Sequence, residues 1–188
     1  MSTLPPSSLS ESPPPLSFLT GSWYVTYSTL PMWKDNRNVR ITYTELPPSN
    51  PAASSIPRLD DLVEYQPLAS DKIKTVHGID SPSGTDTRAW DWRGKGWLKV
   101  VSSHWEFVDW GRAGGGSGEG EGEGTSEGNE EEWAVVWFEK TIFTPEGIDI
   151  FVRGKEGLRE ETVREIKERL GGGRHKTMSE GLFEVTRN

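Results

Sequence analysis

Cysteine is absent from the 188-residue chain, and this absence excludes several kinds of chemistry at once. Without thiols there is no disulfide bond, no thiolate metal ligand and no cysteine nucleophile. A secreted domain of this size often carries a disulfide, so the composition favours a reducing compartment. Residues 1–15, MSTLPPSSLSESPPP, have neither the basic start nor the apolar stretch of a signal peptide. We therefore expect a cytoplasmic protein.

Long apolar runs and positive charge are also scarce. No stretch of membrane-spanning length is apolar throughout, so we expect no membrane span. The chain has 29 acidic and 21 basic residues, a formal net charge of −8, which opposes nucleic acid as a partner. The three histidines, His77, His104 and His175, are scattered, and no phosphate-binding or zinc-protease motif occurs. We expect no metal and no cofactor, and a haem ligand among these histidines is the alternative left open.

Tryptophan, in contrast, is abundant, with nine residues. An indole buries a large apolar area and keeps one N–H donor, which suits both a core and a ligand pocket. Apolar and polar residues alternate with a period of two in many segments, as they do in half-buried strands. This pattern predicts about eight strands, near residues 22–28, 38–46, 59–67, 71–79, 86–93, 96–109, 133–138 and 148–153.

The period changes after Gly157. Leu158, Val163, Ile166 and Leu170 recur at helical spacing, and the glycines at 171–173 stop the helix. A short strand is expected over 182–186. The sequence thus predicts an all-β fold, an up-and-down antiparallel eight-stranded β-barrel with one C-terminal α-helix and a short final strand.

Composition also predicts the domain organisation. The Pro/Ser-rich segment 1–15 has too little apolar surface to fold, so we expect a disordered tail. A single barrel domain occupies 16–188. Within it, 111–132 reads as a flexible insert rich in glycine and glutamate.

Two short motifs carry a family resemblance. Gly21-Ser22-Trp23 follows a short apolar plug at the start of the first predicted strand, and Arg153 ends the last one, just before the helix. This pattern resembles the lipocalins of the calycin superfamily, in particular their cytoplasmic or bacterial-type members. The resemblance implies that Arg153 packs over Trp23 at the closed end of the barrel. An even number of meandering strands brings the two residues to the same end, and Gly21, Trp23 and Arg153 are therefore given structural roles.

The lipocalin resemblance also implies a ligand inside the barrel, whose interior is wide enough for one small molecule. We expect a monomeric protein that binds or carries a small hydrophobic or aromatic ligand. We favour binding without catalysis. By strand alternation the lining candidates are Val25, Tyr27, Tyr43, Trp133 and Trp137. Trp33, in the loop at the open mouth, is expected either to cover the ligand or to pack on the outer wall.

Two other functions stay open. The first is a metal-independent isomerase or cyclase acting on an apolar metabolite in the barrel. His104 and Glu106 fall on one strand face and are its main catalytic candidates. His77, Asp91 and Asp109 are further titratable candidates. The alternative for this cluster is a hydrogen-bonded histidine on the barrel wall with outward carboxylates. The second function is an interaction role for the acidic run between residues 119 and 132.

Overall fold

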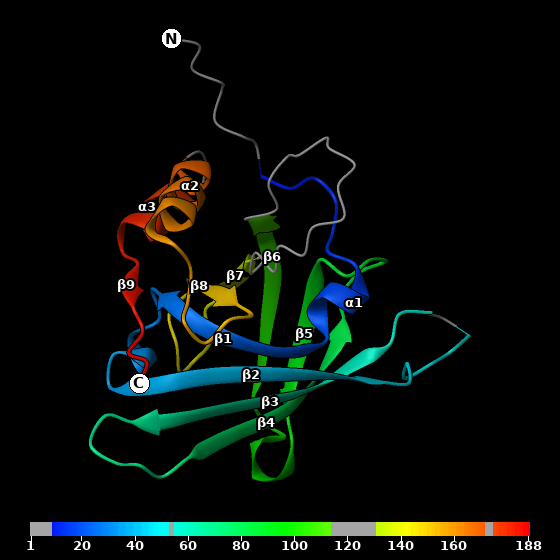
Figure 1. The fold of residues 1–188 in the computed structure, drawn as a ribbon. Helices are drawn as coiled ribbons and strands as arrows, with labels where there is room; N and C mark the ends of the chain where they lie inside the picture. The colour runs from blue at the N-terminus through cyan, green and yellow to red at the C-terminus, as the bar shows by residue number, and fades with distance from the viewer. Residues whose placement is uncertain (1–8, 53–54, 114–130, 172–174) are drawn as a thin grey trace, which may run out of the picture.

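The computed structural model describes residues 9–52, 55–113, 131–171 and 175–188 (Figure 1). Its centre is a ring of antiparallel strands, each hydrogen-bonded to the next one along the chain. They are β1 (Gly21–Ser28), β2 (Asn36–Leu46), β3 (Arg58–Pro67), β4 (Lys74–Pro82), β5 (Ala89–Gly94), β6 (Ser102–Ala113), β7 (Glu131–Phe138) and β8 (Gly147–Val152). Because β1 pairs with both β2 and β8, the ring is closed. The predicted eight-stranded up-and-down barrel is confirmed.

Short helices and one extra strand complete the fold. The helix α1 (Leu16–Leu19) precedes β1, and two 3₁₀ turns, η1 (Pro31–Trp33) and η2 (Gly96–Leu98), lie in loops. After β8 the chain forms α2 (Glu160–Leu170), α3 (Lys176–Glu180) and β9 (Phe183–Glu184). β9 pairs with β1 outside the ring. The predicted helix and final strand are present, whereas α3 is too short for its periodicity to be recognised in the sequence.

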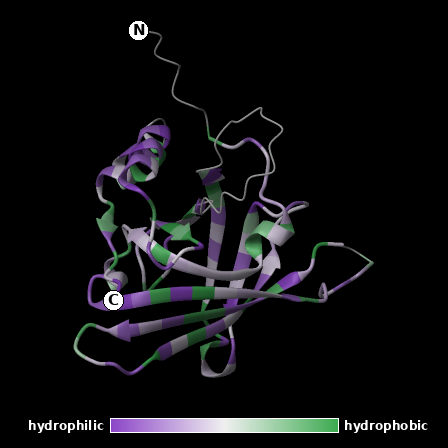
Figure 2. Cartoon of the chain, in the orientation of Figure 1, coloured by the Kyte–Doolittle hydropathy of each residue, from purple (hydrophilic) through white to green (hydrophobic). Residues whose placement is uncertain are grey.

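Two apolar layers hold the barrel together. Side chains alternate between the inner and outer faces of each strand, and Figure 2 shows the resulting bands of hydropathy along β2 and β3. The interior layer includes the buried indoles of Trp23, Trp90 and Trp105. The outer layer lies between the barrel wall and α2, which contributes Ile166 and Leu170. β8 contacts both layers, so all six of its residues are buried.

The closed end of the barrel is built around Arg153, directly after β8. Its guanidinium carbon lies 3.7 Å from the ring centroid of Trp23, the contact that the lipocalin resemblance implies. Arg153 Nη1 donates to the carbonyl of Ser22 at 3.0 Å, and Nη2 donates to that of Thr20 at 2.7 Å. Trp23 Nε1 donates to the carbonyl of Leu19 at 2.8 Å. These bonds fix α1 across the end of the barrel as a plug.

Gly21 makes this arrangement possible at the first position of β1. Its φ of 95° lies in a region that L-residues rarely adopt. A Cβ at this position would also lie only 3.1 Å from Arg153 Nη1. Both the backbone and the close approach of the guanidinium therefore require glycine here.

Part of the segment expected to be a disordered tail lies against the barrel. Residues 1–8 are outside the described part of the chain, but 9–15 are described and contact β6. The Ser10 amide donates to Asp109 Oδ1 at 3.0 Å, and Trp110 Nε1 donates to the Ser12 carbonyl at 3.0 Å. The expected boundary is corrected accordingly, because long-range hydrogen bonds of this kind leave no trace in composition.

The insert expected over 111–132 is also bounded by strands. Residues 111–113 end β6 and residues 131–132 begin β7, where Gly111 pairs with Trp133 and Arg112 pairs with Glu132. Residues 114–130 lie outside the described residues. The two flanks of the predicted insert are thus ladder residues of the barrel.

Candidate functional site

A cavity of about 220 Å³ enters the barrel at the end opposite α1. The loops β1–β2, β3–β4, β5–β6 and β7–β8 all lie at this open end, because each of these strand pairs turns there. The wall is mostly apolar, with two buried carboxyl groups. The lining residues are Leu30, Met32, Trp33, Ile41, Tyr43, Asp61, Val63, Val76, Trp92, Val101, Ser102, Ser103, Trp105, Phe138, Thr141, Phe143, Thr144 and Asp149.

Asp149, on β8, is one of these two buried carboxyl groups and is only 1% exposed. Ser28 Oγ donates to Asp149 Oδ1 at 2.5 Å, and Trp33 Nε1 donates to Oδ2 at 3.2 Å. Burial raises the pKa of Asp149 to about 7, although both hydrogen bonds favour the carboxylate. A pKa in this range suits a group that donates or accepts a proton near neutral pH.

A β-bulge in β1 brings Ser28 to this carboxyl group. The pairing of β1 with β8 shifts between Val25 and Tyr27, so Thr26 is an extra residue in the ladder. Such a bulge moves the side chains that follow it to the opposite face of the strand. Ser28 consequently faces the interior, while Tyr27 faces α2, where Lys167 Nζ lies 5.4 Å from its ring centroid.

Asp61 on β3 and Asp80 on β4 form a second buried acidic group. Their carboxyls are hydrogen-bonded to each other, and Trp105 Nε1 donates to Asp80 Oδ1 at 2.8 Å. Burial is the main cause that raises the pKa of both groups, and neighbouring carboxylates add to it. Asp61 Oδ1 and Asp80 Oδ2 accept no hydrogen bond from any donor group in the described residues. Two carboxyls that share one proton account for this arrangement, and Asp61 is the member that lines the cavity.

Gly78 leaves the space in which Trp92 covers the acidic pair. It lies opposite Asp61 in the β3–β4 ladder. A Cβ on Gly78 would lie 2.2 Å from Trp92 Nε1, so no side chain fits there. Trp92 in turn hydrogen-bonds Asp61. Each of these three carboxyl groups thus has an indole N–H partner, which is Trp33 for Asp149, Trp105 for Asp80 and Trp92 for Asp61.

Stacked aromatic rings form one wall of the cavity. The centroids of Tyr43 and Trp105 lie 5.8 Å apart, and those of Trp105 and Trp90 lie 5.9 Å apart, with interplanar angles of 24° and 18°. Burial raises the pKa of Tyr43 well above its ordinary value. The cavity is therefore a tryptophan-rich surface on which carboxyl groups occupy defined points.

Solved structures with the same topology were found by comparison. Lobster apocrustacyanin A1 superposes with a TM-score of 0.55 at 9% identity, over 92% of this chain and 79% of that chain. The cockroach allergen Per a 4 superposes with a TM-score of 0.56 at 11% identity, over 99% of this chain and 94% of that one. Both are lipocalins. This chain has the lipocalin fold.

One protein is similar to this chain in amino-acid sequence. No family model matches the chain. A protein of the fungus Botryotinia fuckeliana, botcinic acid biosynthesis cluster B protein 12, is 31% identical over 109 residues. The match covers 54% of this chain and 46% of the fungal protein, so it spans less than half of that relative.

Three of the expected lining residues lie in the interior layer of the lipocalin barrel. Trp33 and Tyr43 line the cavity. Val25 is buried in the same layer without being part of the cavity wall. Tyr27 was expected beside Val25 but lies in the outer layer, because the bulge at Thr26 reverses the alternation.

The expected inward face of β7 was wrong. Trp133 and Trp137 belong to the outer layer, and Arg169 covers the Trp133 ring at 5.4 Å. Ala134 and Val136 occupy the interior instead. Because both faces of β7 are apolar, its sequence gives no indication of which one turns inward. The small residues face the crowded interior, and the large indoles cover the wall beneath α2.

His104 and Glu106 lie on the outer wall of the barrel, since Trp105 between them points inward. His104 Nδ1 lies 2.7 Å from Asp91 Oδ1, and Nε2 lies 3.2 Å from Glu106 Oε1. Burial lowers the pKa of His104, but the two carboxylates outweigh it and raise the pKa overall. The proposed placement of this pair in the cavity is corrected, and the alternative of a hydrogen-bonded wall histidine agrees with the geometry.

The other two titratable candidates also lie away from the cavity wall. His77 Nε2 lies 2.9 Å from Asp60 Oδ2. Asp109 is buried in an ion pair with Arg169, whose Nε lies 2.8 Å from Oδ2. Among the described residues, no three His, Asp or Glu side chains gather as metal ligands would.

Sequence reasoning missed the three buried carboxyl groups, Asp61, Asp80 and Asp149. For Asp149 a signal was present. By period two it shares a strand face with Phe151 and Arg153, and Arg153 was expected at the closed end over an interior indole. An acidic residue on the face of a strand that otherwise turns inward is the pattern to look for.

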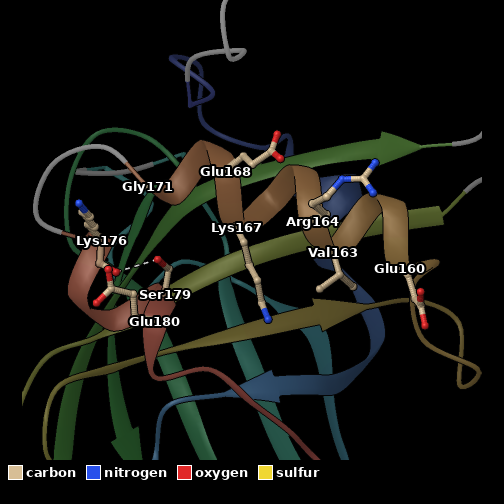
Figure 3. Close-up of a pocket in the computed structure, with 9 residues that line it drawn as sticks. All are labelled: Glu160, Val163, Arg164, Lys167, Glu168, Gly171, Lys176, Ser179 and Glu180. Carbon is tan, nitrogen blue, oxygen red and sulfur yellow. Dashed lines mark hydrogen bonds between the residues drawn. The ribbon is translucent and has the colours of Figure 1, made fainter.

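A second hollow, between α2 and α3, is of a different kind. Figure 3 shows Arg164 and Glu168 pointing away from the barrel, while Val163 and Lys167 point toward it. Ser179 Oγ donates to the Lys176 carbonyl at 2.7 Å. The hollow is bordered by charged and solvated side chains, so it offers a ligand little apolar contact. None of the helices in the described ranges is long and apolar enough to cross a membrane.

Proposed function

We propose that the chain binds a small, mostly apolar organic molecule that carries one polar group, in the cavity at the open end of the barrel. The observation that carries this proposal is the burial of Asp61 and Asp149 in a tryptophan-rich cavity wall. The apolar wall would hold the body of the ligand. The carboxyl groups would hydrogen-bond its polar group, for example a hydroxyl or a carbonyl.

The energetic cost of these groups supports a role in binding. Burying a carboxyl group away from water costs several kcal/mol unless it is paired, and apolar replacements of buried polar groups are often as stable. A well-packed apolar replacement of these carboxyl groups together with their hydrogen-bond partners would hold the barrel as well. Asp61 and Asp149 therefore contribute little to stability, and recognition of a ligand gives them a purpose.

The volume of the cavity limits the size of the ligand. A cavity of roughly 150 Å³ in a protein core holds benzene, and this one has about 220 Å³. A substituted single ring, or a chain of similar size, would fill it. A larger molecule would extend through the open mouth past Met32 and Phe143, which line the entrance.

Both kinds of relative agree with a small-molecule ligand. Lipocalin barrels have an interior suited to one small ligand. The name of the fungal relative assigns it to the biosynthesis cluster of botcinic acid. We infer from these two relationships that the ligand of this chain is an organic metabolite rather than an ion or a peptide.

The proposal can be tested with para-cresol and toluene, two rings of similar size of which only the first has a hydroxyl group. Each is titrated into the full chain while the indole N–H resonances are followed by NMR. The resonances of Trp33 and Trp92 are expected to shift, whereas that of Trp97, which is 88% exposed, stays in place. A hydrogen bond to a buried carboxyl should make cresol bind about tenfold more tightly than toluene.

Asp61→Leu is the informative variant, because leucine keeps the branched shape and removes the polar atoms. It should abolish the preference for cresol and keep toluene binding. Asp91→Leu makes the same change on the outer wall and should bind both probes as the wild type does. If neither probe shifts Trp33 and Trp92, or if cresol keeps its advantage in Asp61→Leu, the proposal is wrong.

A second candidate function is catalysis by proton transfer, as in an isomerase or cyclase. The specific observation in its favour is that Asp149 and Asp61, both with raised pKa, line one cavity, with Asp80 buried behind Asp61. In this mechanism the Asp149 carboxylate removes a proton from the carbon next to a carbonyl group, and Asp61 donates its proton to the carbonyl oxygen. The enol then takes the Asp149 proton at another carbon while its O–H returns a proton to Asp61. The substrate is isomerised and both carboxyls are restored.

A β,γ-unsaturated cyclohexenone, converted to its α,β-conjugated isomer, is a suitable probe because ultraviolet absorption reports the product. Loss of a general base typically costs about 100-fold or more in rate. Asp149→Asn should therefore be inactive while it still binds cresol, and His104→Ala should match the wild type. Equal rates for the wild type and Asp149→Asn would remove catalysis and leave the binding proposal standing.

A further inference from the structure

The open end of the barrel carries an unusual concentration of exposed apolar side chains. Four loops meet there, over residues 29–35, 68–73, 95–101 and 139–146. All the large hydrophobic side chains found exposed in the described part of the chain lie in these loops. Figure 2 shows the apolar colour in the β3–β4 loop, which contains Leu68 and Ile73. Among the described residues, the strand faces and the closed end contribute none.

The most exposed of these residues are here called the apolar collar: Trp97, Val100, Ile142 and Phe143. Their exposed fractions are 88%, 89%, 91% and 69%. Val100, Ile142 and Phe143 border one groove between the β5–β6 and β7–β8 loops, and Trp97 belongs to the first of these loops. Large apolar side chains exposed together at one end of a protein are typical of a binding surface for a protein or a membrane.

The charges around the collar differ from those of the whole chain. The four loops hold five lysines (Lys34, Lys72, Lys95, Lys99 and Lys140) and four acidic residues (Asp35, Asp71, Glu139 and Glu146). The complete chain has 29 acidic and 21 basic residues. The β5–β6 loop, Lys-Gly-Trp-Leu-Lys-Val-Val, contains two lysines and no acidic residue. Lys95 pairs with Asp60 on β3, so Lys99 supplies the positive charge in the most apolar part of the collar.

We propose that the apolar collar docks this protein on the surface of a lipid bilayer that contains anionic headgroups. Tryptophan is favoured in the interfacial region of a bilayer, and apolar side chains beside it enter the acyl boundary. Lysines next to them are attracted by anionic headgroups. Trp97 and Lys99 in one loop, with Ile142 and Lys140 in the other, provide both kinds of contact.

Docking in this orientation would place the cavity mouth against the membrane. Phe143 belongs to the collar and also lines the cavity. Val101, the neighbour of the collar residue Val100, lines the cavity as well. An apolar ligand dissolved in the bilayer could then enter the barrel without crossing water. The docking itself does not depend on the proposed ligand, because it rests on the loops alone.

The test is flotation of the full chain with vesicles of phosphatidylcholine, prepared with and without phosphatidylserine. Binding is expected to the mixed vesicles, with a blue shift of tryptophan fluorescence. Because the chain carries a net charge of −8, bulk charge would repel it from such vesicles, and binding has to come from a local surface. Trp97→Ser combined with Ile142→Ser should weaken binding at least about tenfold. Both side chains are exposed, so the fold, checked by circular dichroism, is preserved.

Two charge reversals locate the surface. Lys99→Glu, in the collar loop, should weaken binding severalfold at low salt. Lys155→Glu makes the same change of net charge at the closed end and should have no effect. Equal loss in both variants, or no binding by the wild type, would overturn the proposal. Self-association of the wild type that disappears in the double serine variant would identify the collar as a protein interface instead, and would also overturn it.

Discussion

The guanidinium of Arg153 covers the indole of Trp23 at 3.7 Å and joins the last barrel strand to the first. Arg153 also donates hydrogen bonds to the carbonyl groups of Phe18 and Thr20, and its Nε lies 3.2 Å from Glu132 Oε2. One side chain thus connects α1, β1, β7 and β8. Closure of the ring and closure of its end depend on the same residue.

Replacement of Arg153 should therefore destabilise the whole barrel. A cation–π contact contributes about 0.5–2 kcal/mol, and hydrogen bonds to a charged group contribute about 1.5–3 kcal/mol each. We expect Arg153→Ala to lower the free energy of unfolding in urea by about 3 kcal/mol. Arg164→Ala, on the exposed face of α2, should change it by less than about 0.5 kcal/mol. Similar stability of the two variants would show that the closed end is held by other contacts.

The space above Gly78 leads to a second prediction. Gly78→Ala places a methyl group where Trp92 Nε1 lies, so the indole has to move away from Asp61. We expect a loss of stability of about 1–3 kcal/mol and weaker binding of para-cresol. Gly84→Ala is the matched control, because nothing lies within 4 Å of its Cβ position. An unchanged Trp92 resonance in Gly78→Ala would contradict the prediction.

Much of the fold could be predicted from the sequence, because strand alternation and two terminal motifs determine it. The short pattern at Gly21 and Trp23, with Arg153 at the other end, was enough to predict ring closure. The extents of the strands were predicted less accurately. Residues 102–109 of the predicted strand 96–109 lie in β6, but the predicted strand begins with a 3₁₀ turn at Gly96–Leu98, and β6 continues to Ala113. Local backbone turns of this kind depend on tertiary contacts.

The cavity wall was less predictable than the fold. Tyr27 was assigned to the wrong face because one bulge residue, Thr26, reverses the alternation, and a bulge has no clear sequence pattern. Trp133 and Trp137 were assigned to the wrong face because β7 is apolar on both sides. Asp149 was not considered at all, because acidic residues in strands usually face water. These errors about the cavity wall all concern the direction of side chains, not the position of strands.

The histidine cluster on the outer wall gives a third prediction. His104 faces solvent with Asp91 and Glu106, away from the cavity. The double variant His104→Ala with Glu106→Gln should therefore bind para-cresol and toluene with wild-type affinity in the NMR titration. A tenfold or larger loss of affinity for either probe, with the fold intact by circular dichroism, would show that these outer-wall residues affect ligand binding.

The pKa of Asp149 determines how stability changes with pH. Burial raises this pKa from 3.8 to about 7 in the folded protein, so between these values the native state holds a proton that the unfolded state has released. Stability must then fall as the pH rises through this range, by about 4 kcal/mol for this group alone. Asp149→Asn cannot ionise, so its free energy of unfolding, measured in urea from about pH 4 to pH 8, should fall less steeply than that of the wild type. Equal slopes in the two proteins would mean that folding does not raise the pKa of Asp149 and that this group is ionised in the folded barrel at neutral pH.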